Sequence, residues 1–280
     1  MGKIKFILLF FLSLQIIQVI ASDTTLQYKL IHKVQGSFSD FAIDNLGNIF
    51  LINTNNQIKK LNPQYDSIGV FNDTKRFGKI FSVDVSNPLK LLVYYKDFNT
   101  IITLDRFLNI RNSIDLRKQH ILQAKAVATS YDNNIWVFDE IEATLKKIDD
   151  NGKIILQTAD FRLLFDDFSN PEKIIDSDGM LYLYASKTGW YVFDYYGALK
   201  NKYGLPNWKD VQVINKILMG REEETIYYSE PKRLALINNK LNINLTNFKY
   251  LNIENHVEIL FTYICDPTQI NKLKFNFDIF

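Results

Sequence analysis

The sequence is poor in the residues that cross-link a protein, bind metals or give it a charge of one sign. Cys265 is its only cysteine, so no disulfide can form within the chain, and there are only three histidines. The 280 residues include only six prolines and eleven glycines, and they contain no long low-complexity tract. The 33 Lys and Arg nearly balance the 31 Asp and Glu, so the charge does not favour nucleic acid or an anionic membrane surface as a partner.

Core-forming residues, by contrast, are abundant. Hydrophobic residues make up 47% of the chain and aromatic residues 14%, which excludes a disordered protein. A domain of this length buries about three quarters of the surface that its unfolded chain exposes. An exported protein without disulfides therefore depends on its hydrophobic core for stability.

Residues 1–21 have the pattern of a secretory signal peptide. Lys3 and Lys5 precede an apolar stretch that only one serine and two glutamines interrupt, and Ala21 offers a small residue for cleavage. The alternative, an uncleaved membrane anchor, fits less well because a span needs about 20 apolar residues. We expect cleavage after Ala21 and an exported protein, periplasmic or extracellular, in which residues 22–280 form a single domain.

An internal repeat of about 44 residues is the most informative feature. In each copy a short apolar run ends in a turn-forming or polar residue, as in Ile58-Lys59-Lys60-Leu61-Asn62. The last apolar positions of these runs lie 43, 44, 45 and 43 residues apart, at Leu61, Leu104, Ile148, Phe193 and Leu236. A fixed period of this length predicts a repeat architecture.

Each repeat contains four short runs that favour strands. Two of them precede the repeated apolar position and are separated by a polar turn, where Gly47, Gly179 and Asn133 supply the positive φ that a tight turn needs. One run contains the repeated position and a fourth follows it. Four strands in about 44 residues predict the blade of a β-propeller, whose apolar faces are buried between neighbouring blades.

The ends of the chain bear on the number of blades. A lone strand is expected at residues 28–34. Two inner strands are expected at 257–263 and 273–277, and no outer strand follows them. Pairing the N-terminal strand with the C-terminal strands would cover edges that are otherwise exposed. The sequence thus predicts an all-β, six-bladed β-propeller with four-stranded blades, closed by this pairing.

Two segments carry a family resemblance. They are Asp44-Asn45-Leu46-Gly47-Asn48-Ile49-Phe50-Leu51, with the strand Gln57 to Leu61 after it, and Asp176-Ser177-Asp178-Gly179-Met180-Leu181-Tyr182-Leu183. Both resemble the repeat of the NHL and TolB-like six-bladed propellers. The resemblance implies a fold rather than an activity, and a binding surface made by the loops of one face.

Polar residues end the predicted innermost strands, at Asp44, Asp84, Ser130, Asp176 and Asn215. They are expected to cap turns, as Asp, Asn and Ser do. The alternative is a cation site around the channel, as in a metal-dependent hydrolase or lactonase of the six-bladed kind, which would need clustered oxygen ligands. Lysines in the neighbouring loops oppose such a site, and we expect no metal and no cofactor.

Aromatic residues beside cations, in connections between blades, are the candidate binding residues. They are Phe77, Phe161, Phe168 and Trp208, with Arg76, Arg162 and Lys209 next to them. Aromatic and Arg side chains anchor many protein interfaces. The alternative is that these rings plug the loops onto the propeller. A short helix is expected within residues 160–167.

These features favour a non-enzymatic binding or scaffold propeller, an accessory subunit of a cell-envelope or secretion assembly with a protein partner. The chain is expected to be monomeric on its own. The alternative, the metal-dependent hydrolase or lactonase, stays open at this point.

Overall fold

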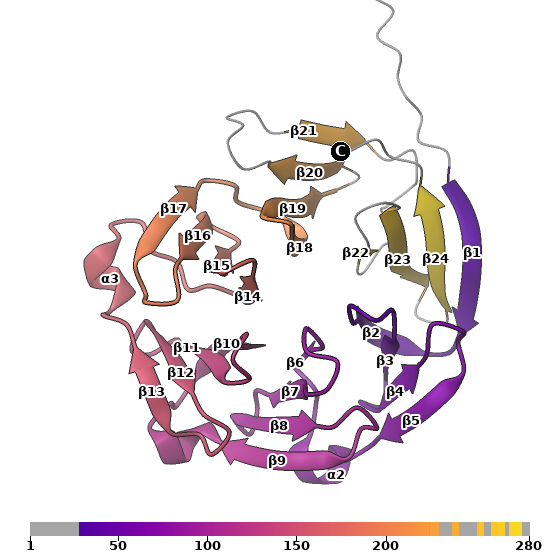
Figure 1. The fold of residues 1–280 in the computed structure, drawn as a ribbon, viewed down its shortest axis with the longest axis horizontal. Helices are drawn as coiled ribbons and strands as arrows, with labels where there is room; N and C mark the ends of the chain where they lie inside the picture. The colour runs from indigo at the N-terminus through magenta and orange to yellow at the C-terminus, as the bar shows by residue number, and fades with distance from the viewer. Residues whose placement is uncertain are drawn as a thin grey trace, which may run out of the picture.

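The protein is described by a computed structural model for residues 28–223, 225–229, 237–240, 251–254, 259–266 and 269–275. The predicted signal peptide and its cleavage site lie outside these residues. Figure 1 shows antiparallel sheets arranged around an axis, which makes the fold an all-β β-propeller. Within the described residues, no helix is long and apolar enough to cross a membrane.

Five blades each consist of four consecutive strands. Blade 1 comprises β2 (Phe38–Ile43), β3 (Ile49–Asn53), β4 (Ile58–Leu61) and β5 (Ser67–Phe71). Blade 2 comprises β6 (Ser82–Asp84), β7 (Leu91–Tyr95), β8 (Thr100–Leu104) and β9 (Ile110–Asp115). Blade 3 comprises β10 (Ala124–Thr129), β11 (Ile135–Asp139), β12 (Thr144–Ile148) and β13 (Ile154–Gln157).

The remaining two blades follow in the same order around the axis. Blade 4 comprises β14 (Lys173–Ser177), β15 (Met180–Ala185), β16 (Gly189–Phe193) and β17 (Leu199–Tyr203). Blade 5 comprises β18 (Lys209–Ile214), β19 (Ile217–Glu222), β20 (Thr225–Ser229) and β21 (Ile237–Lys240). Three short helical turns lie in connections between blades: α2 (Thr74–Phe77), η1 (Leu116–Gln119) and α3 (Phe161–Leu164).

The first strand of each blade lies nearest the axis and the fourth lies at the outer edge. In Figure 1, β10 lies beside β14 and β14 beside β18, around the centre. The middle strands are buried on both faces. In β7, for example, Leu91 and Val93 pack toward blade 1, whereas Leu92 and Tyr94 pack toward blade 3. Since successive side chains of a strand point to opposite faces, a run without alternation fits a sheet held between two others.

Four hydrophobic clusters join the five blades in series. The cluster between blades 1 and 2 contains Phe50 and Tyr95, and the next contains Tyr94 and Val137. Blades 3 and 4 share a cluster that includes Phe138, and blades 4 and 5 share one that includes Trp190. Burial of such large side chains contributes about 1.5–3 kcal/mol each, so these interfaces dominate the stability of the ring.

The two ends of the described chain meet in a separate four-stranded sheet, in the order β1-β24-β23-β22. Its strands are β1 (Tyr28–Gln35), β22 (Leu251–Glu254), β23 (Ile259–Asp266) and β24 (Gln269–Phe275). β1 pairs antiparallel with β24, with Tyr28 opposite Phe275. This sheet joins strands from distant parts of the chain, unlike the five blades of consecutive strands.

The prediction of a six-bladed ring is therefore corrected to five blades of four consecutive strands. A blade is held by apolar clusters on its faces, and the clusters of the described residues run in series only through those five. Val34 of β1 packs against the blade 1 cluster, but no cluster of described residues joins this sheet to blade 5. Strand pairing between the chain ends does not by itself establish closure as an equivalent blade.

The repeat predicts most elements of blades 1–4 and fails in blade 5. The predicted runs around Leu61, Leu104, Ile148 and Phe193 coincide with β4, β8, β12 and β16. In blade 5 the third strand is β20 and not the run ending near Leu236, which lies outside the described residues. The predicted positive φ is present at Gly47, Asn133 and Gly179, and the helix expected within residues 160–167 is α3.

Candidate functional site

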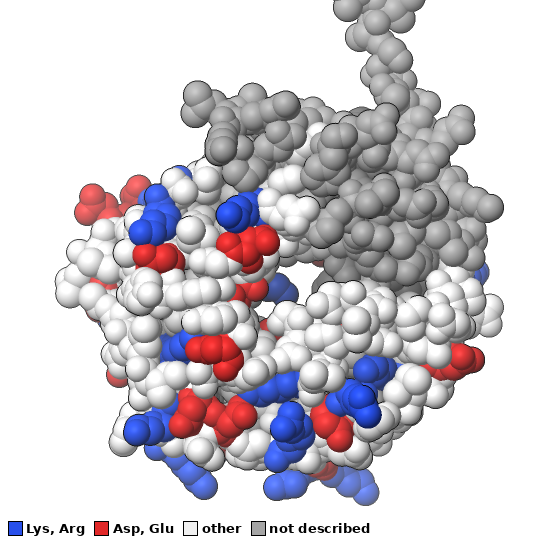
Figure 2. Space-filling view, in the orientation of Figure 1, with Lys and Arg blue, Asp and Glu red and all other residues white. Residues whose placement is uncertain are grey.

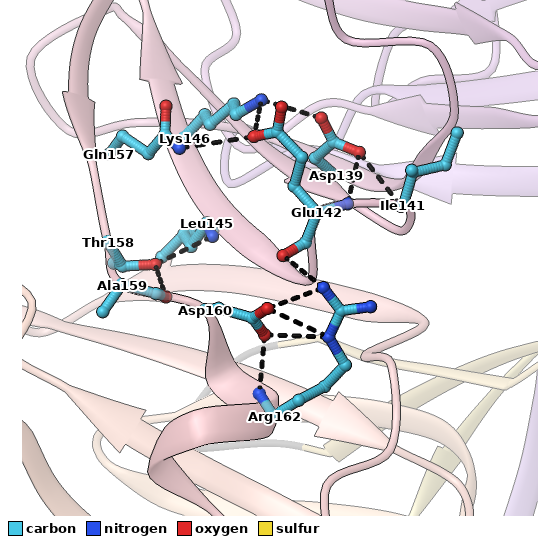
Figure 3. A network of polar contacts seen from close by, with 10 residues as sticks. All are labelled: Asp139, Ile141, Glu142, Leu145, Lys146, Gln157, Thr158, Ala159, Asp160 and Arg162. Atoms are coloured by element: carbon cyan, nitrogen blue, oxygen red, sulfur yellow. Dashed lines mark hydrogen bonds and ion pairs between the residues drawn. The ribbon is translucent and has the colours of Figure 1, made fainter.

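One face of the propeller carries the connections between blades and the turn between the second and third strands of each blade. In a four-stranded antiparallel blade these segments share one end, whereas the other two turns lie at the opposite end. We call this end the loop face. Over blade 3 on this face, α3 lies beside the β11–β12 turn (Figure 3).

The α3 turn is fixed by an aromatic ring beneath it. Phe161 is fully buried and stacks on Phe193, with 5.3 Å between ring centroids and 19° between planes. It also contacts Phe138, Phe165 and Phe168 at 5.5–5.7 Å. Each such aromatic pair contributes about 0.5–1.5 kcal/mol beyond the burial of area. The start of the connection is therefore anchored in the core shared by blades 3 and 4.

Polar contacts hold the same turn from above. Asp160 caps α3 by accepting the Arg162 N–H at 2.9 Å, and it accepts the Arg162 guanidinium at 2.6 Å through Nη2 (Figure 3). The same guanidinium donates to the Glu142 carbonyl at 3.2 Å, and the Phe161 N–H donates to the Ala143 carbonyl at 2.9 Å. The hydrogen bonds from Arg162 lower the pKa of Asp160. These contacts tie α3 to the β11–β12 turn.

A buried ion pair shapes that turn. Lys146 and Asp139 are 2% and 1% exposed and lie 2.7 Å apart, and Glu142 contacts the same ammonium group at 2.7 Å. Asp139 also accepts the N–H groups of Ile141 and Glu142, at 3.0 and 3.3 Å. A buried charge with several partners is stable only while all of them remain, so this network holds the turn in one conformation.

Four large aliphatic side chains are exposed on this rigid base. We call them the apolar patch: Leu122, Ile141, Leu163 and Leu164, with exposures of 61%, 51%, 83% and 54%. The Glu140 N–H donates to the Gln123 carbonyl, which joins the segments that carry Leu122 and Ile141. The Arg162 contact to Glu142 joins Ile141 to α3. Ordered backbone lowers the entropy cost of binding, which makes these exposed side chains candidates for an interaction site.

Carboxylates border the apolar patch. Asp166 and Asp167 are exposed in the connection after α3, and Glu142 is 46% exposed beside it. The nearby cations Arg162 and Lys146 already contact carboxylates of their own, at 2.6 and 2.7 Å. The rim of the patch is thus acidic, although both signs of charge are interleaved on the face of the ring in view in Figure 2.

The predicted aromatic anchors are for the most part interior residues. Phe77, Phe161 and Trp208 are 6%, 0% and 5% exposed, and Phe168 packs half-buried against the cluster of blades 3 and 4. Trp208 stacks on Tyr227 at 6.0 Å and donates its N–H to the Tyr184 hydroxyl at 2.6 Å. These contacts are those of loop plugs, which was the alternative for these residues.

The predicted cations remain on the surface, and the structure does not bring all of them together. Arg162 is clamped by Asp160, Arg76 lies over the Phe77 ring at 4.8 Å, and Lys209 is exposed at the start of β18. Arg76 and Arg162 lie in two different connections between blades, and Lys209 directly follows a third. The apolar patch was not predicted from the sequence, although a capped turn with two adjacent leucines was a usable signal.

The predicted polar ring lies at the ends of the first strands, and some of its members bond across blades as well as within their own turns. Asp44 accepts the N–H groups of Leu46 and Asn48 within its turn. Asp84 accepts the Ser86 N–H of its own turn at 2.8 Å and also the Thr129 N–H of the next blade at 2.6 Å.

Asp176 reaches back to blade 3, where it accepts Ser130 Oγ at 3.2 Å and Trp136 Nε1 at 3.0 Å. It also accepts the hydroxyl of Tyr195 in its own blade at 2.5 Å; burial and this bond raise the pKa of Tyr195. Asn215 directly follows β18, with φ of 50°. Among the residues that the structure describes, no group of three or more His, Cys, Asp or Glu is placed to hold a metal ion.

Comparison with known proteins identifies the fold. No protein-family model matches the sequence, and no curated protein sequence matches it. Solved β-propellers do: a streptogramin B lyase aligns with a TM-score of 0.59 and 15% identity, over 84% of this chain and 78% of that one.

Two further structures show the same likeness. A catalytically inactive histidine-to-alanine variant of virginiamycin B lyase from Staphylococcus aureus, with quinupristin, has a TM-score of 0.60 and 13% identity, over 88% and 99% of the two chains. The WD40 propeller domain of Doa1 has a TM-score of 0.56 and 10% identity, over 89% and 97%. At these identities the likeness establishes the β-propeller fold, which enzymes and WD40 domains share.

Proposed function

We propose that this protein is a binding propeller that holds a protein partner on the apolar patch of its loop face. The observation that carries the proposal is Leu163, 83% exposed on a helical turn whose neighbour Phe161 is fully buried. A large apolar side chain displayed on an immobilised turn loses little entropy on binding, and burying it gains about 1.5–3 kcal/mol.

The acidic rim defines the chemistry of the partner. Asp166 and Asp167 flank the leucines, so the segment that docks there is apolar with Lys or Arg beside it. Like-charged segments would be repelled, which gives the patch a preference as well as an affinity. The likeness to WD40 domains is consistent with such a role, at the level of fold.

The enzymatic alternative has weaker support. The inactive lyase variant shows that a histidine matters in that protein. In this chain His32 stacks on Tyr65 at 3.4 Å, and His120 caps η1 with φ of 60°. Both described histidines thus have structural surroundings outside the strands that line the axis. No observation favours the metal-dependent hydrolase or lactonase over a binding role.

Export remains part of the proposal. It rests on the signal-like pattern of residues 1–21, with Lys3 and Lys5 before the apolar stretch. N-terminal sequencing of the protein recovered from its native host tests it. A product that begins at Ser22 is expected, and a product that keeps Met1 would reject the proposal.

Site-specific photo-crosslinking tests the docking surface. A crosslinker at position 163 and one at Tyr196, which is 92% exposed in the β16–β17 turn at the opposite end of its blade, would be compared in native extract. We expect a discrete adduct only from position 163, and its peptide should combine apolar residues with Lys or Arg.

Affinity measured with the identified partner completes the test. Leu163→Ala should weaken binding by about 2 kcal/mol, as for an interface hot spot, while the free energy of unfolding changes by no more than about 0.5 kcal/mol. Tyr196→Ala is the matched control and should change neither. Equal capture from both positions, or an acidic crosslinked peptide, would overturn the proposal.

A further inference from the structure

A depression of about 430 Å³ lies on the outside of blade 2 and shares no lining residue with the apolar patch. It is bounded by α2, η1 and the outer strand β9, and the β7–β8 turn contributes Phe98. Figure 1 shows α2 next to β9 at the rim of the ring. A volume of this size is in the range of small-molecule sites, which is about 300–1,000 Å³.

The walls of the depression combine apolar groups with unused hydrogen-bond donors. Phe98 is 46% exposed, and Phe77 and Ile114 are buried behind it. Ser113, Gln119 and Asn151 also line the depression, and among the described residues none of these three side chains has a polar partner. Hydroxyl and carboxamide groups without protein partners can donate to a ligand.

The charge of the depression is positive. Arg76 and Lys118 line it, and within the described part of the chain neither is paired with a carboxylate. The only acidic lining residue is Asp115, and Arg117 already occupies both of its carboxylate oxygens, at 3.0 and 3.3 Å. The Arg76 guanidinium lies 4.8 Å from the centre of the Phe77 ring, which restricts its position.

We propose that this depression binds a small organic anion: a phosphate or carboxylate group attached to a planar apolar body. The anionic group contacts Arg76 and Lys118, and the apolar body lies against Phe98. Arg suits this task because its planar donors match the oxygens of phosphate and carboxylate. The inference is independent of the protein partner, since the depression and the apolar patch share no residue.

Calorimetric titration with matched probes tests this site. Phenyl phosphate is expected to bind at least tenfold more tightly than inorganic phosphate or phenol, because only it engages the cations and the apolar wall together. Phenylacetate replaces the phosphate by a carboxylate, and the tighter of the two anions identifies the anionic group.

Substitutions then locate the site. Arg76→Gln and Lys118→Gln should each raise the Kd for phenyl phosphate at least tenfold, with the melting temperature unchanged because both side chains are exposed. Lys75→Gln removes the same charge from the same helical turn but not from the depression, and should leave the Kd within twofold. No heat of binding at millimolar probe, or equal weakening by all three substitutions, would overturn the inference.

Discussion

The connection that enters blade 4 and the one that enters blade 5 contain the same kind of residues and present opposite surfaces. The first contains α3; it buries Phe161 and exposes Leu163. The second buries Trp208, and none of its other residues has a large exposed apolar side chain. The first is much longer than the second, but both contain an aromatic residue beside a cation and both lie on the loop face.

The difference comes from what each aromatic ring finds in the adjoining blade. Trp208 fits over Gly220 of β19, where a Cβ atom would come within 2.5 Å of the ring. The absence of a side chain there makes room for the indole. Phe161 packs into a cluster of aromatic rings shared by blades 3 and 4, and the two leucines after Arg162 remain exposed. An aromatic residue in a loop is therefore weak evidence for a binding site unless the adjoining surface is known.

The largest expected effect is the loss of the Trp208 plug. Trp208→Ala should lower the free energy of unfolding by about 3–5 kcal/mol, as for other buried Trp side chains. Urea denaturation measures it. Partner binding per folded molecule should be unchanged, because Trp208 lies away from the apolar patch. A stable variant with weakened binding would instead make Trp208 an anchor.

The Gly220 gap should be the next most sensitive position. Gly220→Ala places a methyl group against the packed Trp208 ring, and overpacking of this kind costs about 1–3 kcal/mol. Gly204→Ala is the matched control, since a Cβ atom there would meet nothing within 4 Å. If both variants melt at the same temperature, the gap does not determine the position of the indole.

Alkaline pH should lower the free energy of unfolding through Tyr182 and Tyr184, two buried tyrosines near Trp208. Burial raises the pKa of Tyr182 and Tyr184 to about 12, whereas a tyrosine in the unfolded chain titrates near about 10. Between these values the unfolded chain loses phenol protons that the folded chain keeps, so stability should fall from about pH 10 to about pH 12. Phenolate absorbance measures the ionisation of the tyrosines, and circular dichroism measures the unfolding of the protein.

Tyr182→Phe with Tyr184→Phe should reduce this pH dependence, and Tyr94, Tyr95 and Tyr195, whose pKa values burial also raises, should account for the remainder. The double variant also loses the Tyr184 bond to the Trp208 N–H, so its stability is compared at neutral pH first. An unchanged alkaline transition would assign the effect to other groups.

The smallest expected effect is at the α3 connection. The Arg162 hydrogen bonds lower the pKa of Asp160, so the ionised carboxylate adds stability above its unfolded pKa of about 3.9. This contribution disappears as the pH falls through the lower, folded pKa.

Asp160→Asn keeps one oxygen that can cap α3 and removes the charge together with the second oxygen, which accepts the Arg162 guanidinium. Its melting temperature should be slightly below that of the wild type at pH 7 and equal to it near pH 2. A difference that persists at low pH would show that the cap, rather than the ion pair, holds the turn.

The strands of blades 1–4 could be predicted because their signal is local. A run such as Leu91 to Tyr95 is fully apolar, and its length and flanking turns identify a buried strand wherever it packs. Blade 5 was harder, since the repeated position near Leu236 suggested a third strand later than the observed β20. The number of blades was predicted as six by adding one blade, made of the strands at both chain ends, to the five repeats, which assumed that this sheet is equivalent to the others.

The sequence predicted which face of the propeller carries the candidate site, but not which side chains are exposed on that face. The strand order places Arg162 and Phe161 on the loop face, as expected from the repeat. The strand order does not predict that Phe161 points inward while Leu163 points outward. The α3 helix is only one turn long, so its orientation depends on the contacts of Phe161 with Phe193 and Phe138. The polar ring was similarly predicted as turn caps, which holds for Asp44 and Asp84, but the bonds of Asp84 and Asp176 across blades were not predicted.

The sequence by itself determined the all-β class, the propeller repeat, most strand positions and the turns at Gly47, Asn133 and Gly179. These follow from periodicity and backbone preference over a few residues. Only the tertiary structure decided which loop aromatics are buried, which leucines are exposed and where the cationic depression lies. Those properties depend on side chains from different blades or connections, such as Gly220 beneath Trp208, and no local pattern encodes how they meet.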